Sequence, residues 1–448
     1  MSQQNTTIIG ATPETVRSYL LVLAEALKGT VMPRLDGHAH SIADECAMIA
    51  TRLAQQISGD PAAKALLAMV ATNGADDTND TNAGRLRDVS AERRAFDLVE
   101  TEAKALFGEG LHNEPARAFD RQRFENYLQQ HPLGGRDTCI VETTMLSGGR
   151  SKTTTLITQE GARDLPRQFV LRQDGTGAQQ EFTKELVRPI ALEYQIMAFA
   201  HANGIKAPRT LLLEASTEPM GGAFMAIERC AGSAAGDMFK PLKSDRYALE
   251  LAAQLGQLHS RPVDSLAATV PMRSSTEAQL SRELAGMREV HQQMGTPSRT
   301  VDIALDWMQE NIAKVQGPLS LVHGDMAYNN TMAENGHLVA FLDWELSHLG
   351  NAAKDLGFVR TSIEQVLPWP QFMAAYEAAG GPVFSPLTID FYTLWGQMWL
   401  YSITQQSRVG VVKHGLKDIE LVHYCAHFGP VIMQRMARTL EAVLGKPA

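Results

Sequence analysis

Apolar residues recur three and four positions apart through the first part of the chain, which is the spacing of one helix face. The clearest stripe ends at Ser58-Gly59 and consists of Ile42, Cys46, Ile49, Leu53 and Ile57. Another helix is expected after Thr12-Pro13, where an N-cap residue precedes proline at the first helical position. The pattern predicts a small all-α domain over residues 1–130 and leaves its role open.

The pattern changes to short runs rich in β-branched residues after His131-Pro-Leu-Gly-Gly135. Cys139–Val141 and Thr153–Thr158 flank the glycine-containing stretch Leu146–Ser151, which predicts a strand, a turn and a second strand. The remaining elements expected here are strands at Gln168–Arg172, Pro208–Leu213 and Ala223–Ile227, and a helix at Ala191–Ala200. Residues 131–230 are therefore predicted to form a small sheet lobe.

Helical spacing returns from Ser244 onward. One stripe ends at His259, which we interpret as a buried histidine at a helix end. Further helices are expected at Ser281–Gln293, Val301–Val315, Phe391–Ser407 and Leu421–Leu444. Residues 231–448 are therefore predicted to form a larger helical lobe.

One β-hairpin interrupts this helical part of the chain. Leu319–Val322 is a short apolar run after Gly317-Pro318 and predicts a strand that enters a loop. Asn335-Gly336 is the dipeptide that a type I′ turn favours, because both positions need positive φ. The hairpin register then places Glu334 opposite His337 and Asn330 opposite Phe341, with Asp343 on the same side as Asn330.

This hairpin gathers oxygen donors in one small region with the loop residue Asp325. Carboxylate and amide oxygens suit Mg²⁺, which needs few protein ligands when nucleotide phosphates supply the rest. A free carboxylate nearby can orient a hydroxyl and accept its proton, as phosphoryl transfer requires. Taken singly, His323-Gly-Asp325 is an ordinary turn and Asp343 a strand-end cap. Their combination favours the catalytic interpretation.

Composition narrows the function classes. The chain has 448 residues, a net charge of -9 and a sequence pI near 5.8, which gives no electrostatic case for nucleic acid or an anionic membrane as partner. No apolar run is long enough to span a bilayer, and the amino terminus lacks the pattern of a signal peptide. The four cysteines are widely separated, which fits reduced thiols in a cytoplasm. A cytoplasmic protein is expected.

The loop and hairpin together resemble the aminoglycoside phosphotransferase-like kinases. That family's catalytic loop has the form His-Gly-Asp, four residues, Asn, and its metal-binding aspartate lies in Asp-Trp-Glu or a close variant. Both patterns are present here, in Leu321–Asn330 and Val339–Glu345. The resemblance implies that Asp325 is the catalytic base, that Asn330 and Asp343 bind Mg²⁺, and that His323 braces the loop.

The resemblance covers most of the chain from about Asp137 to the carboxyl terminus. It implies an α+β, two-lobed protein-kinase-like fold, with a small antiparallel-sheet lobe and a larger helical lobe. The small all-α domain would precede it. ATP is the implied phosphoryl donor, with GTP as an open alternative, and Mg²⁺ is the implied cofactor.

One branch of the family, which phosphorylates hydroxyacyl-CoA thioesters, looks most similar. The similarity rests on Leu342–Leu346, Leu349-Gly350 and Asp355-Leu356. That branch commonly has aspartate where Asn351 stands, so Asp355 is expected to brace the catalytic loop instead.

The glycine turn and the strand after it are expected to hold the nucleotide phosphates. Gly148 and Gly149 let backbone N–H groups approach phosphate oxygens, and Ser151 adds a hydroxyl. The family usually has asparagine where Lys152 stands, so the contacts here are expected to differ.

Arg172 ends the next strand, where kinases carry a phosphate-holding cation that pairs with a helix carboxylate. Its expected partner is Glu193, and the alternative is an ordinary surface ion pair. The resemblance identifies the loop from Glu228 to Gly232 as the hinge, where backbone groups near Glu228 and Cys230 would bind adenine.

The sequence therefore predicts an ATP- and Mg²⁺-dependent kinase that acts on a hydroxyl of a small molecule, with a hydroxyacyl-CoA as the favoured acceptor. A CoA thioester carries several phosphates, and the cations proposed for them are Arg360, Arg408, Lys413 and Lys417, whose alternative role is solvated surface charge. Two other functions stay open: a kinase for aminoglycosides or other polyhydroxylated metabolites, and a nucleotide-binding pseudokinase scaffold. Oligomeric state is not readable from the sequence.

Overall fold

The computed structural model describes residues 85, 89, 90, 93, 119–146, 152–174, 188–273, 276–294, 298–412 and 428–445. The helices expected before residue 119, and most of the all-α domain with them, lie outside these ranges. The glycine turn does too, and with it Gly148, Gly149 and Ser151.

The chain divides into two compact units. One joins residues 114–279 to 315–392, and the other joins 1–113, 280–314 and 393–448. The first unit contains every candidate site residue named above that the structure describes. The division of the chain at residues 130 and 230 stays a prediction.

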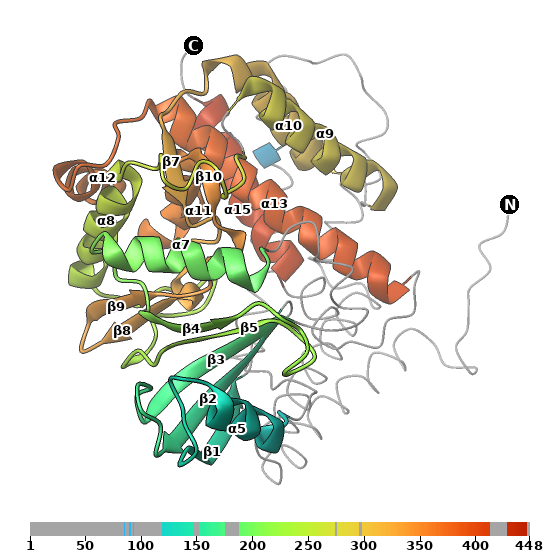
Figure 1. Ribbon diagram of the computed structural model, residues 1–448. Coiled ribbons are helices and arrows are strands. Elements are labelled where there is room, and N and C mark those ends of the chain that lie inside the picture. The colour runs from blue at the N-terminus through green and yellow to red at the C-terminus, as the bar shows by residue number, and fades with distance from the viewer. Residues whose placement is uncertain are drawn as a thin grey trace, which may run out of the picture. The chain divides into compact units, whose positions relative to one another are not determined.

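Five described strands of the first unit form an antiparallel sheet in the order β1-β2-β3-β5-β4 (Figure 1). They are β1 (Cys139–Leu146), β2 (Lys152–Glu160), β3 (Gln168–Asp174), β4 (Thr210–Glu214) and β5 (Phe224–Glu228). The small antiparallel sheet that the β-branched runs predicted is therefore confirmed.

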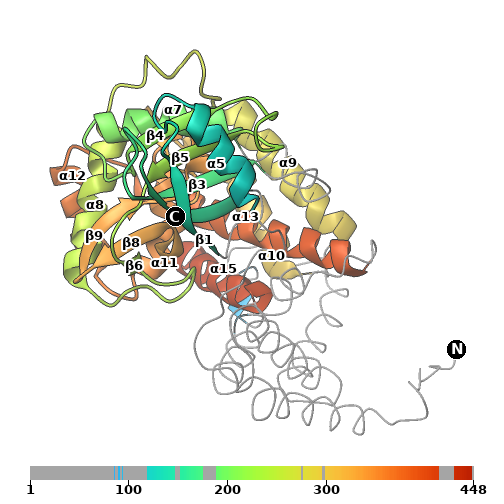
Figure 2. The ribbon, with the colours of Figure 1, turned by 60° about the horizontal axis from the view of Figure 1, so that its bottom comes forward.

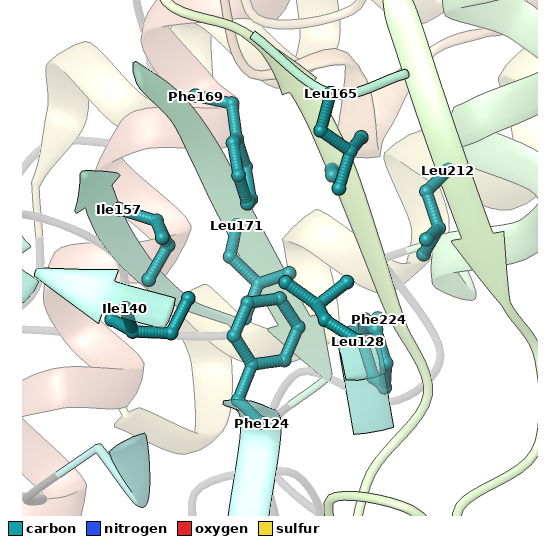
Figure 3. Packing of buried hydrophobic residues seen from close by; sticks show 10 residues of the cluster. Phe124, Leu128, Ile140, Ile157, Leu165, Phe169, Leu171, Leu212 and Phe224 are labelled. Atoms are coloured by element: carbon teal, nitrogen blue, oxygen red, sulfur yellow. The ribbon is translucent and has the colours of Figure 1, made fainter. Parts of the chain in front are cut away.

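Alternation along β3 gives the sheet two different faces. Phe169 and Leu171 point toward helix α5 (Arg121–Gln130), whose Phe124 and Leu128 complete a buried apolar cluster (Figure 3). The other members of this cluster are Ile140, Ile157, Leu165, Leu212, Phe224 and Ala226. Helix α5, which belongs by sequence to the end of the helical region, packs on the sheet.

The opposite face of the sheet lies against helix α7 (Ile190–Ala202), which contacts β3, β4 and β5. Ile196 and Met197 are buried there. Arg172 lies one position after Leu171 on β3, so its side chain points toward α7. The fold thus separates an apolar face from a face that carries charge.

The rest of the first unit is mainly helical. Helices α8 (Asp245–Ser260) and α12 (Trp369–Ala378) pack side by side (Figure 1 and Figure 2). Ser244 caps α8 by accepting a hydrogen bond from the Tyr247 N–H at 3.3 Å. The other elements are β6 (Ser233–Ala234), β7 (Leu319–Val322), η4 (Tyr328–Asn330), β8 (Thr331–Glu334), β9 (His337–Phe341), η5 (Trp344–Leu346), β10 (His348–Asn351), α11 (Ala353–Ile363) and the start of α13 (Pro386–Val412).

The predicted hairpin is confirmed between β8 and β9. Asn335 and Gly336 have φ of 53° and 78°, as a type I′ turn requires. Glu334 pairs with His337, as expected.

The far end of the hairpin corrects the predicted register, because Thr331 rather than Asn330 stands opposite Phe341. The register shifts between Met332 and Ala333, where Val339 is the extra residue of a β-bulge. The Leu342 N–H donates to the Asn330 carbonyl at 2.8 Å, so the two arms of the hairpin remain hydrogen-bonded beyond the bulge.

The second unit contains most of α9 (Glu277–Met294), α10 (Arg299–Asn311), η3 (Ile312–Lys314), the later part of α13, and α15 (Gly429–Leu444). Helix α10 packs on α15. The buried His291 ring shares a hydrogen bond of 2.9 Å with the Tyr401 hydroxyl. Within the described ranges, no helix combines the length and apolar character that crossing a membrane would take.

Candidate active site

The loop after β7 is anchored by one buried carboxylate, Asp355, in the first turn of α11. It accepts hydrogen bonds from the backbone N–H groups of His323 at 2.7 Å and Gly324 at 2.9 Å. The His259 Nε2 lies 3.1 Å from the same carboxylate. Burial alone would raise the pKa of Asp355, but the contact with His259 and the backbone donors outweigh it and lower that pKa. Asp355 therefore braces the loop as an ionised group, as expected.

Gly324 is required by the shape of this loop. Its φ is 87°, in the region that glycine adopts without strain. A Cβ at this position would lie 2.4 Å from the Leu346 carbonyl oxygen, which is backbone and has no room to move aside. The loop therefore packs directly against the segment that follows Asp343.

His323 supports the loop from inside, as the resemblance implied. It is fully buried, its Nε2 donates to the Leu342 carbonyl at 2.9 Å, and its ring centroid lies 4.8 Å from that of Trp344. Burial lowers the pKa of His323, so the ring is neutral and its Nδ1 accepts from the Asp325 N–H at 3.4 Å. His323 thus connects the loop to the end of β9 without carrying charge.

Asp325 is half-buried at the loop tip and is held by Asn330. The Asn330 Nδ2 donates to Asp325 Oδ2 at 2.8 Å and to the Asp325 carbonyl at 2.9 Å. Burial and the nearby charge of Asp343 raise the pKa of Asp325 to about 7, although the bond from Asn330 opposes that shift. The carboxylate is thus oriented, close to other acids and able to take a proton near neutral pH.

Asp343 adopts a left-handed backbone conformation, with φ of 60° and ψ of 65°. Its Oδ1 accepts from the Arg172 Nη2 at 2.8 Å. Burial acts to raise the pKa of Asp343, but the charge and hydrogen bond of Arg172 outweigh it and the pKa is lowered. The structure therefore brings the two predicted residues Arg172 and Asp343 into direct contact.

Arg172 also pairs with Glu193, as predicted, at 3.3 Å between Nε and Oε1. Glu193 is fully buried, so the alternative of a surface ion pair is wrong. The pair belongs to a larger network that we call the Glu193 cluster. Its members are Lys152, Arg172, Glu193, Asp343 and Glu345.

Lys152 is the member of this cluster whose role the sequence did not reveal. Its side chain is 1% exposed, and its Nζ lies 3.0 Å from Glu345 and 3.3 Å from Glu193. The same Nζ donates to the Arg188 carbonyl at 2.9 Å. Two features of the sequence could have indicated this role. Lys152 begins the strand that follows the glycine turn, and Glu345 lies two positions after Asp343.

The predicted hinge follows β5. The Glu228 side chain is exposed, and its backbone N–H donates to the Arg209 carbonyl at 2.8 Å. The backbone groups of Cys230 enter no backbone hydrogen bond within the described part of the chain. Burial raises the pKa of the Cys230 thiol to about 11, so this thiol is protonated.

Of the four cations predicted for the acceptor phosphates, the structure describes only the side chain of Arg360. Arg360 is paired with Glu364 at 2.8 Å and with Asp390 at 2.7 Å, so it is not a free cation for an acceptor phosphate. The Arg408 side chain, Lys413 and Lys417 lie outside the described residues.

The donors present fit a shared Mg²⁺ site better than a closed protein cage. No group of three or more His, Cys, Asp or Glu side chains in the described ranges forms a ready metal site. Asp325 and the Glu193 cluster together hold four carboxylates, on Asp325, Glu193, Asp343 and Glu345, against two cations, Lys152 and Arg172. An added divalent cation would balance this excess, with phosphate oxygens completing its coordination.

The model of the phosphotransferase enzyme family matches residues 142–392, which is more than half of the chain. The chain belongs to this family. The match contains both Asp325 and the Glu193 cluster, so the phosphotransferase family domain and the site described above coincide.

Curated relatives of this phosphotransferase domain are parts of much longer proteins. Acyl-CoA dehydrogenase family member 11 of Rattus norvegicus is 25% identical over 251 residues, which cover 54% of this chain and 31% of that protein. Acyl-CoA dehydrogenase family member 10 of Mus musculus is 26% identical over 272 residues, covering 57% of this chain and 24% of that protein. The chain thus spans a third or less of the length of either relative.

Solved phosphotransferase structures share the fold. A Ralstonia eutropha protein provisionally assigned as an aminoglycoside phosphotransferase aligns with a TM-score of 0.56 at 18% identity, covering 72% of this chain and 99% of that one. Spectinomycin phosphotransferase in complex with ADP and spectinomycin aligns with a TM-score of 0.50 at 14% identity, covering 72% and 100%. The two-lobed kinase-like fold predicted from the sequence is therefore confirmed for this part of the chain.

Proposed function

We propose that this chain transfers the γ-phosphoryl group of ATP to a hydroxyl of a small molecule, and that its acceptor is a hydroxyacyl-CoA. The observation that carries the proposal is the contact between Asn330 and Asp325 beside the Arg172–Asp343 pair. A positioned base, a phosphate-holding cation and metal-binding oxygens are what phosphoryl transfer needs from a protein.

Asp325 acts as the base in this proposal. The Asn330 amide fixes one carboxylate oxygen, Oδ2, and leaves Oδ1 to accept the proton of the acceptor hydroxyl. The hydrogen bonds from the His323 and Gly324 N–H groups to Asp355 fix the loop that carries Asp325. The chain thus orients the nucleophile without large rearrangement.

Asn330 and Asp343 would hold Mg²⁺, which when bound supplies positive charge to the phosphate oxygens. Arg172 reaches the same region and can hold a phosphate through two N–H groups. Glu193 fixes the Arg172 guanidinium from the other side through Nε. Gly148, Gly149 and Ser151 are proposed to approach the phosphates, and the backbone at Glu228 and Cys230 to bind adenine.

Two observations support an acyl-CoA acceptor. The pattern from Leu342 to Leu346 resembles the hydroxyacyl-CoA branch. The curated relatives that share this domain are named as acyl-CoA dehydrogenase family members, so a related segment occurs in proteins named for acyl-CoA.

The test is a mass-spectrometric screen for phosphorylated products with Mg²⁺·ATP. The panel contains a 4-hydroxyacyl-CoA, the matching free hydroxy acid, and an aminoglycoside. Phosphorylation of the thioester well above that of the free acid is the expected result. Turnover of the aminoglycoside alone would assign the alternative acceptor, and no ATP turnover with any acceptor would indicate a pseudokinase scaffold.

A further inference from the structure

A group of basic side chains surrounds His348 on β10, next to the catalytic loop. We call it the His348 cluster; its members are Arg188, Arg273, His348 and Lys354. A Cβ at Gly324 would lie 3.3 Å from His348 Nδ1, so the His348 ring touches the loop one residue before Asp325. None of these four residues has a part in the phosphoryl transfer described above.

Arg188 is the best-defined member of the cluster. Only 6% of the residue is exposed, its backbone N–H donates to the Glu345 carbonyl at 2.8 Å, and its Nε donates to the Ser347 carbonyl at 3.1 Å. Its Nη2 is buried and has no hydrogen-bond partner among the residues that the structure describes. The guanidinium is therefore fixed in place with one donor unused, which is costly for a buried charged group.

The other members place positive charge beside this unused donor. The Lys354 Nζ lies 3.4 Å from His348 Nε2, and the opposite ring nitrogen contacts the Leu346 carbonyl at 2.8 Å. Burial and then the charge of Lys354 put the pKa of His348 well below its usual value, so the ring is neutral.

Arg273 approaches from the other side of β10. Its N–H donates to the Leu349 carbonyl at 2.7 Å. Burial, followed by the charge of Arg273, lowers the pKa of Arg188 to about 10. An anion bound at the Arg188 Nη2 would be attracted by the positive charges of this cluster.

We propose that the His348 cluster is an anion subsite that receives a phosphate group of the acceptor. This inference rests on the proposed function and narrows it to phosphate-bearing hydroxyl acceptors, of which a CoA thioester is one. Arg188 would offer the unused Nη2 donor, and Arg273 and Lys354 would add charge. A polycationic aminoglycoside would be repelled at the same place.

The experiment measures binding rather than turnover. Coenzyme A, which lacks an acceptor acyl group, is titrated calorimetrically into the full chain saturated with Mg²⁺·ADP, so that the nucleotide site is occupied. Arg188→Gln and Arg273→Gln are each expected to weaken coenzyme A binding at least tenfold. Arg360→Gln is the matched control, because Arg360 is a cation on the same helix as Lys354 and is held outside the cluster by Glu364 and Asp390. The affinity of this variant for coenzyme A should stay within twofold of wild type.

Mg²⁺·ADP affinity, measured on each variant, checks folding and should not change. Arg273 is only half-buried, so its variant keeps the test informative if Arg188→Gln fails to fold. The inference is overturned if coenzyme A does not bind the wild type, if both variants bind it normally, or if ADP affinity falls equally. An equal fall in ADP affinity would indicate that Arg188 and Arg273 bind the nucleotide.

Dephospho-coenzyme A identifies the phosphate. Weak binding of this probe to the wild type indicates that the subsite holds the 3′-phosphate, and unchanged binding indicates the pyrophosphate; either result supports the subsite provided that the variants weaken coenzyme A. Arg188-dependent binding without kinase turnover would keep the subsite and reject the proposed kinase. Turnover of an aminoglycoside without coenzyme A binding would keep the proposed kinase activity and reject the subsite.

Discussion

At the scale of single residues, Asp325 and Asn330 form the smallest unit of the candidate site. The amide of Asn330 reaches both the side chain and the carbonyl of Asp325, so the two residues hold each other in position. An asparagine at position 325 could still accept the same bond through its amide oxygen. The variant Asp325→Asn is therefore well suited to separate chemistry from folding.

We expect Asp325→Asn to lower kcat by roughly 10²- to 10⁴-fold, the range that general base catalysis contributes. Nucleotide affinity should stay within about twofold, since the base is not a phosphate ligand. Steady-state kinetics and an ADP titration on the same preparation measure both. A variant with near-normal kcat would reject Asp325 as the base.

Asp355 gives a prediction about pH. In Asp355→Asn one carboxylate oxygen becomes an NH₂ group facing the donors that Asp355 now accepts from, so the loop loses a buried ionic anchor. The free energy of unfolding should fall by roughly 3–5 kcal/mol at pH 7.

The direction of the pH dependence of stability follows from the lowered pKa of Asp355 in the folded chain. A carboxyl whose pKa is depressed by folding stabilises above its unfolded pKa of about 3.9 and loses this contribution as the pH falls through the folded pKa. The difference in the free energy of unfolding between wild type and Asp355→Asn should thus be constant from pH 8 to about 5 and shrink in stronger acid. Denaturant unfolding across this range measures it, and a difference that grows in acid would contradict the assignment.

At the scale of elements, the structure shows which sequence patterns were informative. The apolar run that predicted a strand at Leu319–Val322 matches β7, because a buried strand next to Gly-Pro has few alternative structures. The strand predicted at Gln168–Arg172 matches β3. The bulge at Val339 was not predictable, since Leu338 to Phe341 are all apolar and show no polar and apolar alternation that an extra residue would interrupt.

The role of Lys152 was beyond reach for a different reason. Its partner Glu345 is 193 positions away in the sequence, and no local pattern reports a contact at that separation. The family resemblance showed only that a lysine replaces the usual asparagine. The contact itself depends on how β2, α7 and η5 meet, which is a property of the assembled fold.

Lys152→Met tests this junction between elements. It leaves Glu193 and Glu345 with one cation fewer, and the loss of a buried ionic partner is expected to cost roughly 3–5 kcal/mol. Glu345→Gln in the same chain should restore part of that loss, with a coupling energy of roughly 0.5–3 kcal/mol. Denaturant unfolding of wild type, the two single variants and the double variant gives the free energies of this double-mutant cycle. Purely additive effects would show that the 3.0 Å contact contributes nothing.

At the scale of the whole molecule, a net charge of -9 combines with a Glu193 cluster in which three carboxylates face two cations. Nucleotide phosphates therefore meet repulsion unless a cation accompanies them. Arg172 alone does not remove this repulsion, because Asp343 and Glu193 already share it.

Thermal unfolding should report this dependence. ADP with Mg²⁺ at a hundredfold excess over its Kd is expected to stabilise the chain by about 2.7 kcal/mol, whereas ADP with a chelator should shift Tm much less. For a domain of this size each kcal/mol corresponds to roughly 2–4 °C. Equal shifts with and without Mg²⁺ would show that the protein neutralises the phosphates unaided.

The left-handed backbone of Asp343 determines which replacement of this residue the fold tolerates best. A residue with a Cβ in this conformation costs roughly 1–2 kcal/mol relative to glycine, so Asp343→Gly should unfold at a higher denaturant concentration than Asp343→Ala, although both lack the carboxylate. A lower midpoint for the glycine variant would contradict this. Among variants that have already lost the carboxylate, selection for thermal tolerance alone would therefore favour glycine over alanine, so a library that varies position 343 needs a catalytic screen to keep the proposed metal ligand.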